Sequence, residues 1–267
     1  MVGSPQVVLV TGGSSGIGKA VCETLAAAGH QVHGTSRRPD ERPQGWTLLP
    51  MDLGDEHSVE AAVAEVLARA GRIDVVVNNA GLGIQGATED LTPAQAASLL
   101  DTNVLGAHRV CRAVLPRMRA QGNGLLINVT SLAANFGLPY RGFYSASKAA
   151  LERYTETLSM EVRPFGIHAV TLQPGEYKTN IGGKRIRPAE SSAPYKKGYE
   201  RAMELLDGSL HYSRDPAEVG RLVLRIMSMR APVGTYYAAH GKQRLAVLLK
   251  KWLPAGLFQR LMMKEYR

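Results

Sequence analysis

Residues 7–18 read VVLVTGGSSGIG and decide the fold. The first four, Val7 to Val10, are β-branched or aliphatic, as in a strand that is buried on both faces of a parallel sheet. A glycine-rich turn follows directly, and Ile17 to Ala28 then carry apolar residues at helical spacing up to Gly29. A strand, a glycine-rich turn and a helix in this order predict the first unit of an α/β fold.

The glycine-rich turn has the spacing Gly-x-x-x-Gly-x-Gly, from Gly12 to Gly18. Glycines let a backbone turn tightly and approach a pyrophosphate, and a helix N-terminus offers free N–H groups to phosphates. The alternative, a turn without a ligand, is disfavoured because the glycines lie at the first strand-to-helix junction. The predicted dinucleotide-binding residues of this turn are Gly12, Ser14, Ser15, Gly16, Ile17 and Gly18.

The same alternation continues along the chain. Short apolar runs predict further strands over 31–35, 46–51, 74–78, 125–130, 167–172 and 235–238. Helical periodicity predicts helices over 55–70, 93–121 (as two helices that meet near Asn103), 143–163 and 215–229. With right-handed crossovers this order gives a Rossmann-like, doubly wound parallel sheet of about seven strands with helices on both faces. Residues 179–199 show no clear pattern, so they form either a functional lid or a simple loop.

The composition fits a globular protein without disulfides or metal. The chain has 267 residues, of which 45% are hydrophobic and 21% charged, and a chain of this length can bury its core without cross-links. Cys22 and Cys111 lie in apolar, helix-like segments, which indicates two buried free thiols. Met1 to Gln6 lack the features of a signal peptide and no apolar run approaches a membrane span, which favours a cytoplasmic protein.

The net charge of +9 is concentrated in the C-terminal segment. Residues 242–267 hold seven basic residues and one acid, which makes +6. The charges alternate with apolar residues as in two short amphipathic helices that separate near Pro254, and we treat this segment as an extension of a domain formed by residues 1–241. It could pack on the domain or on another subunit, which we favour, cover a hydrophobic substrate, or, last, contact anionic lipid. No nucleic-acid-binding motif accompanies the charges, so no nucleic acid is expected as a partner.

Arg37 and Arg38 follow the second predicted strand. In enzymes that use NAD, an acid about 20 residues after the glycine-rich turn binds the ribose hydroxyls. An arginine there can instead pair with a 2′-phosphate, and its guanidinium can lie over the adenine. These two residues therefore predict NADP(H) as the cofactor. The alternatives are a solvated basic turn, or a role for the nearby acids Asp40 and Glu41.

Tyr144, Lys148 and Ser131 are suited to acid–base chemistry. Tyr144 and Lys148 are four residues apart in a predicted helix, so they share a face. An ammonium beside a phenol lowers the phenol pKa from about 10, so the pair could exchange the proton of a carbonyl/alcohol couple. Ser131 follows a strand, where a hydroxyl faces the ligand crevice. Each signal is weak by itself, because such pairs and turn serines are common.

Taken together, these motifs resemble the single-domain short-chain dehydrogenases/reductases over roughly residues 5 to 240. The C-terminal segment is similar to tails of the steroid and retinol dehydrogenase-like members. The resemblance implies a catalytic tetrad of Asn103, Ser131, Tyr144 and Lys148. It also implies that the cofactor is contacted by Asp52, Leu53, Asn79, Ala80, Gly81, Tyr144, Lys148, Pro174, Gly175 and Thr179.

The activity implied by the resemblance is hydride transfer between a nicotinamide and a carbonyl or alcohol carbon. Tyr144 would donate or accept the proton, while Lys148 would lower the pKa of Tyr144 and hold the nicotinamide ribose. Ser131 would polarise the substrate oxygen. Asn103 would hold a water that links Lys148 to solvent.

The substrate loops of the family correspond here to apolar and aromatic segments. Ser131, Phe136, Tyr140 and Tyr177 are the candidate substrate-binding residues, and we expect reduction of a hydrophobic ketone or aldehyde. Family members are mostly dimers or tetramers, so helices 103–121 and 143–163 are candidate interfaces of a homodimer or homotetramer. Three alternatives remain open: a catalytically silent NADP(H)-binding sensor or scaffold, an NAD-dependent alcohol dehydrogenase of the same family, and a peripheral membrane protein held by its tail.

Overall fold

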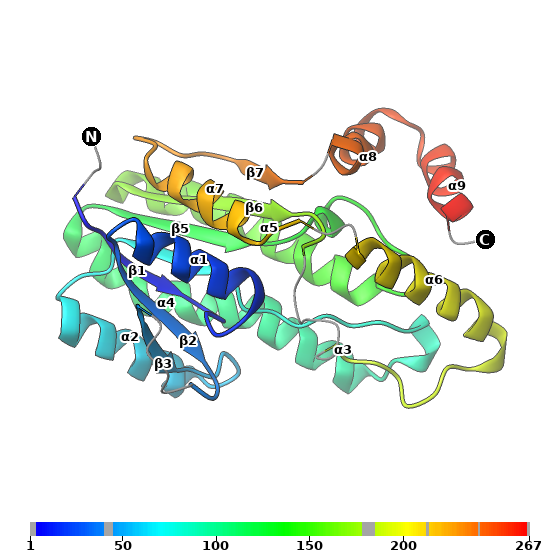
Figure 1. Cartoon of the computed structure of the whole chain (residues 1–267), viewed down its shortest axis with the longest axis horizontal. Coiled ribbons are helices and arrows are strands. Elements are labelled where there is room, and N and C mark those ends of the chain that lie inside the picture. The colour runs from blue at the N-terminus through cyan, green and yellow to red at the C-terminus, as the bar shows by residue number, and fades with distance from the viewer. Residues whose placement is uncertain (1–3, 40–44, 178–184, 212–213, 240, 266–267) are drawn as a thin grey trace.

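A seven-stranded parallel sheet forms the centre of the protein (Figure 1). The computed structural model describes residues 4–39, 45–177, 185–211, 214–239 and 241–265. The strand order is β3-β2-β1-β4-β5-β6-β7, which is the doubly wound topology predicted above. The strands are β1 Val7–Val10, β2 Gln31–Ser36, β3 Thr47–Pro50, β4 Val75–Asn78, β5 Gly124–Val129, β6 Ile167–Pro174 and β7 Thr235–Ala238.

Helices cover both faces of the sheet. One face packs against α2, α4 and α5, and the other against α1 and α7. Two further helices follow β7 and are separated by Leu253 and Pro254, as predicted from their amphipathic pattern. The helices are α1 Gly16–Ala27, α2 Glu56–Ala70, α3 Pro93–Leu100, α4 Gly106–Gln121, α5 Gly142–Val162, α6 Ala193–His211, α7 Ala217–Met227, α8 Gly241–Trp252 and α9 Ala255–Glu265.

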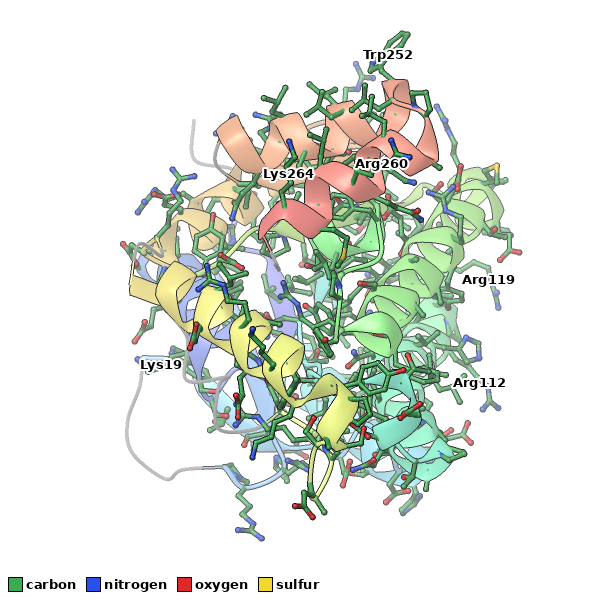
Figure 2. The ribbon with its side chains drawn as sticks, turned by 90° about the vertical axis from the view of Figure 1, so that its right-hand side faces the viewer. Lys19, Arg112, Arg119, Trp252, Arg260 and Lys264 are labelled. Carbon is green, nitrogen blue, oxygen red and sulfur yellow. The ribbon has the colours of Figure 1, made fainter. Side chains whose placement is uncertain are left out.

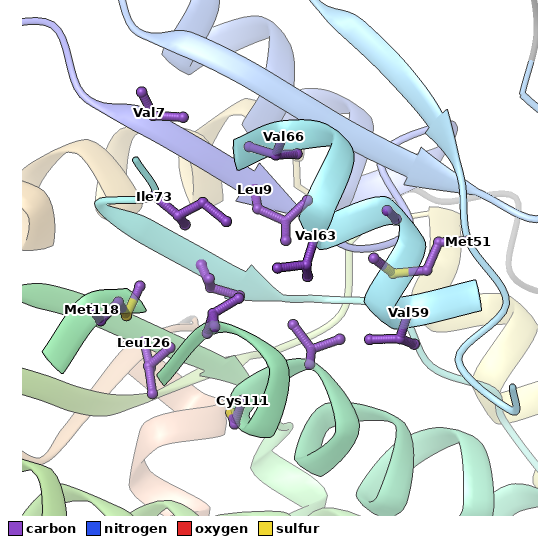
Figure 3. Packing of buried hydrophobic residues seen from close by; sticks show 14 of the residues in the cluster. Val7, Leu9, Met51, Val59, Val63, Val66, Ile73, Cys111, Met118 and Leu126 are labelled. Carbon is purple, nitrogen blue, oxygen red and sulfur yellow. The ribbon is translucent and has the colours of Figure 1, made fainter. Parts of the chain in front are cut away.

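The core below α2 and α4 is fully closed to solvent. Leu9 of β1 and Leu126 of β5 are 0% exposed, and Val63 and Val66 of α2 lie against the same cluster (Figure 3). Truncating a leucine in such a position to alanine costs about 2–5 kcal/mol of the free energy of unfolding. Cys22 and Cys111 are both buried and free, which confirms that prediction. The sheet is therefore a rigid support for the loops at its carboxyl edge.

Helices α3 and α4 are joined by a π-turn over Asp101–Leu105. The prediction of two helices that meet near Asn103 is confirmed, although the chain continues from one into the other without a loop. A π-turn inserts one extra residue into the helical ladder and is frequent at functional sites. It rotates Asn103 into the interior, where this side chain is 1% exposed.

Helix α6 is the main departure from the prediction. Residues 179–199 were expected to be irregular, but α6 begins at Ala193, so the last part of this segment is helical. Gly198 and Gly208 weaken the local helical signal. The helix is stabilised by burial of Ala202 and Leu206 beside the crevice, which a local pattern does not reveal. Figure 1 shows α6, α8 and α9 beyond the end of the sheet at which the strands finish.

Candidate functional site

A cavity of about 1200 Å³ lies at the carboxyl edge of the sheet. It runs from the glycine-rich turn after β1, past the loops after β2 to β6, to α6, α8 and α9. Pockets for one small ligand have volumes of roughly 300–1,000 Å³. The cavity therefore has room for a dinucleotide together with a second molecule, at the edge where doubly wound sheets bind ligands.

The turn after β1 depends on glycine. Gly12 and Gly16 have φ angles of +68° and +55°, a region that disfavours side chains. A Cβ atom on Gly18 would lie 2.2 Å from the carbonyl oxygen of Gly12. Gly18 itself does not line the cavity but packs directly beneath the turn. The other predicted residues of the turn line the cavity wall: Gly12, Ser14, Ser15, Gly16 and Ile17.

Hydrogen bonds of Thr11 join this turn to the loop after β4. Its Oγ1 accepts hydrogen bonds from the backbone N–H groups of Asn79 and Ala80, both at 3.0 Å. The Asn79 side chain in turn donates to the carbonyl oxygen of Thr11 at 2.9 Å. Asn79, Ala80 and Gly81 thereby line the cavity beside the turn. The sequence pattern did not predict this role of Thr11.

The loops after β2 and β3 form the next part of the wall. Arg37 and Arg38 are exposed and line the cavity, as do Asp52 and Leu53. The Arg38 N–H donates to Ser36 Oγ at 3.3 Å, which shapes the loop. The other acids considered at the end of β2, at positions 40 and 41, lie outside the described residues. The two arginines are thus the charged groups that β2 brings to this end of the cavity, within the part of the chain that the structure describes.

Lys148 and Tyr144 both line the cavity from the first turns of α5. Lys148 is 5% exposed, and its ammonium donates to the carbonyl oxygen of Val129 at 3.0 Å. Burial disfavours the charged form and lowers the pKa of Lys148 to about 8. Ser131 lines the same cavity just after β5, where its Oγ accepts from the N–H of Ala133 at 3.2 Å. The structure therefore brings Ser131, Tyr144 and Lys148 to one cavity.

Asn103 supports this group from behind. Its Oδ1 accepts from the Leu82 N–H at 2.7 Å, and its Nδ2 donates to the Leu82 carbonyl and to Ser147 Oγ, both at 3.0 Å. Ser147 Oγ donates onward to the carbonyl oxygen of Tyr144 at 2.8 Å. Asn103 does not line the cavity itself. It fixes the first turn of α5 relative to the loop after β4.

Gly81 separates Asn103 from Lys148. A Cβ atom at Gly81 would lie 3.1 Å from Asn103 Oδ1 and 3.4 Å from Lys148 Nζ. Both polar atoms therefore lie against the same short stretch of backbone. A side chain at position 81 would therefore crowd both of these predicted tetrad members.

The remaining predicted residues divide into three groups. Phe136 and Tyr177 line the cavity, although the Tyr177 hydroxyl donates to the carbonyl oxygen of Ala238 at 3.1 Å. Pro174 and Gly175 also line it. Tyr140 is not among the lining residues, because its ring packs on Tyr199 of α6 with a centroid distance of 5.8 Å. Residue 179, the predicted threonine contact, lies outside the described residues.

Gln85 is a cavity residue that the sequence did not reveal. It is 1% exposed and lines the cavity, yet neither polar atom of its amide has a hydrogen-bond partner within the described part of the chain. Glutamine is common in loops, so no local signal could have identified it. Other lining residues missed by the prediction come from the loop before α5, from the segment before α6 and from helices distant in sequence: Arg141, Arg185, Leu205, Leu206, Gln243, Ala246 and Met262.

A Rossmann-like sheet whose nucleotide-sized crevice also holds serine, tyrosine and lysine side chains defines a class, the single-domain nucleotide-dependent oxidoreductases. The chain belongs to the short-chain dehydrogenase family, whose family model matches residues 6–189. That match spans the sheet from β1 to β6 and includes Asn103, Ser131, Tyr144 and Lys148, the residues predicted to be catalytic. The family and the fold predicted from the motifs are thus confirmed.

Individual relatives cover most of the chain. It is 36% identical to the 3-ketodihydrosphingosine reductase of Bacteroides thetaiotaomicron over 257 residues, 96% of both chains. It is 39% identical to the human 17-beta-hydroxysteroid dehydrogenase type 1, covering 94% of this chain and 82% of the relative. Among solved structures, a short-chain dehydrogenase from Streptomyces avermitilis superposes with a TM-score of 0.83 at 32% identity, covering 100% and 97% of the two chains.

Proposed function

We propose that the protein is an NADPH-dependent carbonyl reductase that converts a large amphiphilic ketone into a secondary alcohol. The observation that carries the proposal is that Ser131, Tyr144 and Lys148 open into the same cavity as the glycine-rich turn. In the overall reaction, the ketone gains a hydride at carbon and a proton at oxygen, and NADPH becomes NADP⁺.

The chain offers the groups that a dinucleotide requires. The turn between Gly12 and Gly16 is shaped by positive φ angles, and α1 begins at Gly16 with its N-terminal N–H groups at the cavity. Arg37, Arg38 and Asp52 line the cavity, and we assign to the two arginines the pairing with a 2′-phosphate and to Asp52 the contact with the adenine. NADPH supplies the hydride when it is bound. The protein binds and orients it through the turn, through the loop after β4 and through Pro174 and Gly175.

Tyr144 is the proposed proton donor to the ketone oxygen. Lys148 lies one helical turn away and lines the same cavity, so we assign to its ammonium the role of offsetting the negative charge that proton transfer leaves there. Because the pKa of Lys148 is about 8, this ammonium is largely charged at neutral pH. Ser131 positions the same oxygen by a hydrogen bond. Asn103 acts as a positioning residue, since its side chain fixes Leu82 and Ser147 and through them the turn of α5 that carries Tyr144.

The walls beyond Tyr144 favour a substrate with one polar end. Gln85 presents a buried, unpartnered amide to the cavity, and burying such a group without a hydrogen bond is costly. Another part of the lining is apolar and includes Leu132, Phe136, Leu205, Leu206 and Met262. A ketone with hydrogen-bonding groups at one end and a long alkyl chain fits both parts of the lining. The name of the Bacteroides relative, 3-ketodihydrosphingosine reductase, supports this substrate class.

The reaction is tested by following the absorbance of NADPH with a panel of ketones. The panel contains 3-ketodihydrosphingosine, a 17-ketosteroid and a small soluble ketone, and we expect the first to give the largest kcat/KM. A Tyr144→Phe variant should lose about 10²–10⁴-fold in kcat while it still binds NADPH. A variant that turns over normally contradicts the assignment of Tyr144. Tight NADPH binding without reduction of any ketone supports a silent sensor instead.

The choice of cofactor is tested by removing both arginines. Arg37→Ala/Arg38→Ala should raise the KM for NADPH by roughly 10–100-fold, because charged hydrogen bonds to the 2′-phosphate are lost, and should leave the KM for NADH unchanged. Arg225→Ala, an exposed arginine on α7, serves as the matched control. An equal rise in KM for NADPH and NADH would show that the arginines do not recognise the 2′-phosphate.

A further inference from the structure

The outer face of α8 and α9 is unusually apolar for a surface. We call residues 241–265, which form these two helices, the C-terminal cap. Trp252 is 84% exposed and points away from the rest of the molecule (Figure 2). Six of the twelve large hydrophobic side chains exposed in the described structure belong to this short segment: Leu245, Leu248, Trp252, Leu257, Leu261 and Met263.

On α8 the exposed apolar residues form one stripe. Leu245, Leu248 and Trp252 are three and four residues apart, so they lie on one side of the helix. Val247 on the opposite side is buried, and Gln243 lines the cavity. Helix α8 therefore has an inner face that belongs to the folded domain and an outer apolar face that contacts solvent.

Helix α9 repeats this arrangement. Leu257 and Leu261, four residues apart, are exposed, while Phe258 is buried and packs on Phe136 with a ring-centroid distance of 5.3 Å. Met262 lines the cavity. The cap is thus anchored by its inner residues, and its exposed leucines are not needed for that packing.

Basic side chains border both apolar faces. Arg244 and Lys251 flank the stripe of α8, and Arg260 and Lys264 project from α9 (Figure 2). Glu265 is the one acidic residue among residues 242–267, which carry a net charge of +6. A second copy of the chain would bring an equally basic face against this one, which like-charge repulsion opposes. A partner complementary to this face would be anionic and would also accept apolar side chains.

An anionic phospholipid surface has both properties. Leucine and tryptophan side chains enter the boundary between headgroups and acyl chains, while lysine and arginine stay at the phosphates. No helix among the described residues is long and apolar enough to cross a membrane, so such contact would be made from the surface. We propose that the outer face of the C-terminal cap binds reversibly to anionic phospholipid membranes.

The consequence for catalysis rests on the proposed function. Gln243, Ala246 and Met262 of the cap line the cavity from the inner side of the same helices. A membrane-bound cap would therefore hold the cavity close to the lipid surface, where a long-chain ketone partitions. The binding itself is independent of the reaction and can be measured without any substrate.

The test uses the full chain and vesicles without substrate. Vesicles of phosphatidylcholine alone are compared with vesicles that also contain phosphatidylglycerol. We expect cosedimentation with the anionic vesicles only, reduced by salt. The emission of Trp252 should shift to the blue on binding, because the only other tryptophan, Trp46, already packs against the core.

Two variants separate the apolar from the basic contribution. Leu245→Ser/Leu248→Ser/Trp252→Ser and Lys251→Glu/Lys264→Glu should each weaken binding roughly tenfold or more. These residues do not line the cavity, so reduction of a small soluble ketone should be unchanged.

Matched controls change equally exposed residues elsewhere. Met160→Ser/Val233→Ser and Arg225→Glu/Arg230→Glu should bind vesicles like the wild type. Equal binding to neutral and anionic vesicles, or cap variants that bind like the wild type, would overturn the proposal. A second outcome would also overturn it: the wild type binds no vesicles but forms an oligomer, and the Leu245→Ser/Leu248→Ser/Trp252→Ser variant is a monomer. If the protein binds vesicles but reduces no ketone, the proposed function is contradicted and the proposed membrane binding is not.

Discussion

The sheet crevice and the C-terminal cap form opposite walls of one cavity, but they are built differently. In the crevice, several buried polar groups are paired, as in the hydrogen bonds that join Thr11 to Asn79 and Lys148 to Val129, whereas the buried amide of Gln85 is not. In the cap, most large side chains are exposed, and the anchors are single residues such as Val247 and Phe258. The wall proposed to bind the cofactor is therefore rigid, whereas the cap wall can move at low cost in free energy.

Replacing one glycine by alanine in each region should give the largest difference in the free energy of unfolding. Gly18→Ala places a methyl carbon 2.2 Å from the Gly12 carbonyl oxygen, so either the turn or α1 must shift. We expect a loss of about 3 kcal/mol in the free energy of unfolding and much weaker NADPH binding. Gly256→Ala in α9 meets no atom within 4 Å and should stabilise the chain by up to about 1 kcal/mol.

Urea denaturation and NADPH titration measure both glycine variants. If Gly18→Ala unfolds like the wild type, the turn is not rigid and the contrast between crevice and cap is wrong. If Gly256→Ala is strongly destabilised, the cap is more tightly packed than its exposure indicates.

Lys148 allows a pH test of burial in the crevice. Its pKa falls from 10.5 in the unfolded chain to about 8 in the folded one, so folding disfavours the ammonium. This penalty, about 3 kcal/mol, is complete below pH 8 and disappears as the pH rises towards 10.5, because the unfolded chain binds the extra proton in that window. The stability of the wild type relative to Lys148→Met should therefore rise with pH between these values.

The measurement compares urea midpoints of the two chains, without cofactor, at pH values on either side of this window. Taking the difference between chains cancels the other groups that titrate there, including Cys111, whose pKa is 9.0 in the unfolded chain and is raised by burial to about 12 in the folded one. A difference that stays flat with pH would mean that the Lys148 ammonium is hydrated in the folded protein.

The same contrast explains what the sequence could predict. Gly12, Arg37, Ser131, Tyr144 and Lys148 each follow or begin a strand or helix with a strong local pattern. The topology of a parallel sheet then brings them to one edge. The π-turn at Asn103 was foreseen only as a boundary between two helices, because a single inserted residue leaves the apolar periodicity on either side intact.

The substrate wall could not be predicted in the same way. Helix α6 contains two glycines and gains its stability from packing beside the cavity, and Tyr140 turns to Tyr199 rather than to the cavity. The amphipathic pattern predicted α8 and α9, but a helix with apolar residues on two sides does not reveal which side faces inward. These features depend on contacts between segments far apart in the chain.

Gln85 lies on the crevice side of the cavity. Its substitution has the smallest expected effect on the free energy of unfolding, and that effect should be an increase. Gln85→Leu replaces a buried, unpartnered amide by an apolar group of similar size, so the cofactor-free chain should gain about 1 kcal/mol in the free energy of unfolding. If the amide binds the polar end of the substrate, kcat/KM for 3-ketodihydrosphingosine should fall by about 10-fold or more while a ketone without polar substituents is unaffected. Gln85→Glu keeps the shape but replaces the amide NH2 donor by a second acceptor oxygen, so it separates the loss of that donor from altered packing. If Gln85→Leu gains stability but its selectivity between the two ketones is unchanged, the polar end of the substrate is recognised on the cap side of the cavity, by residues such as Gln243. The cap, and not the crevice, would then determine substrate selectivity.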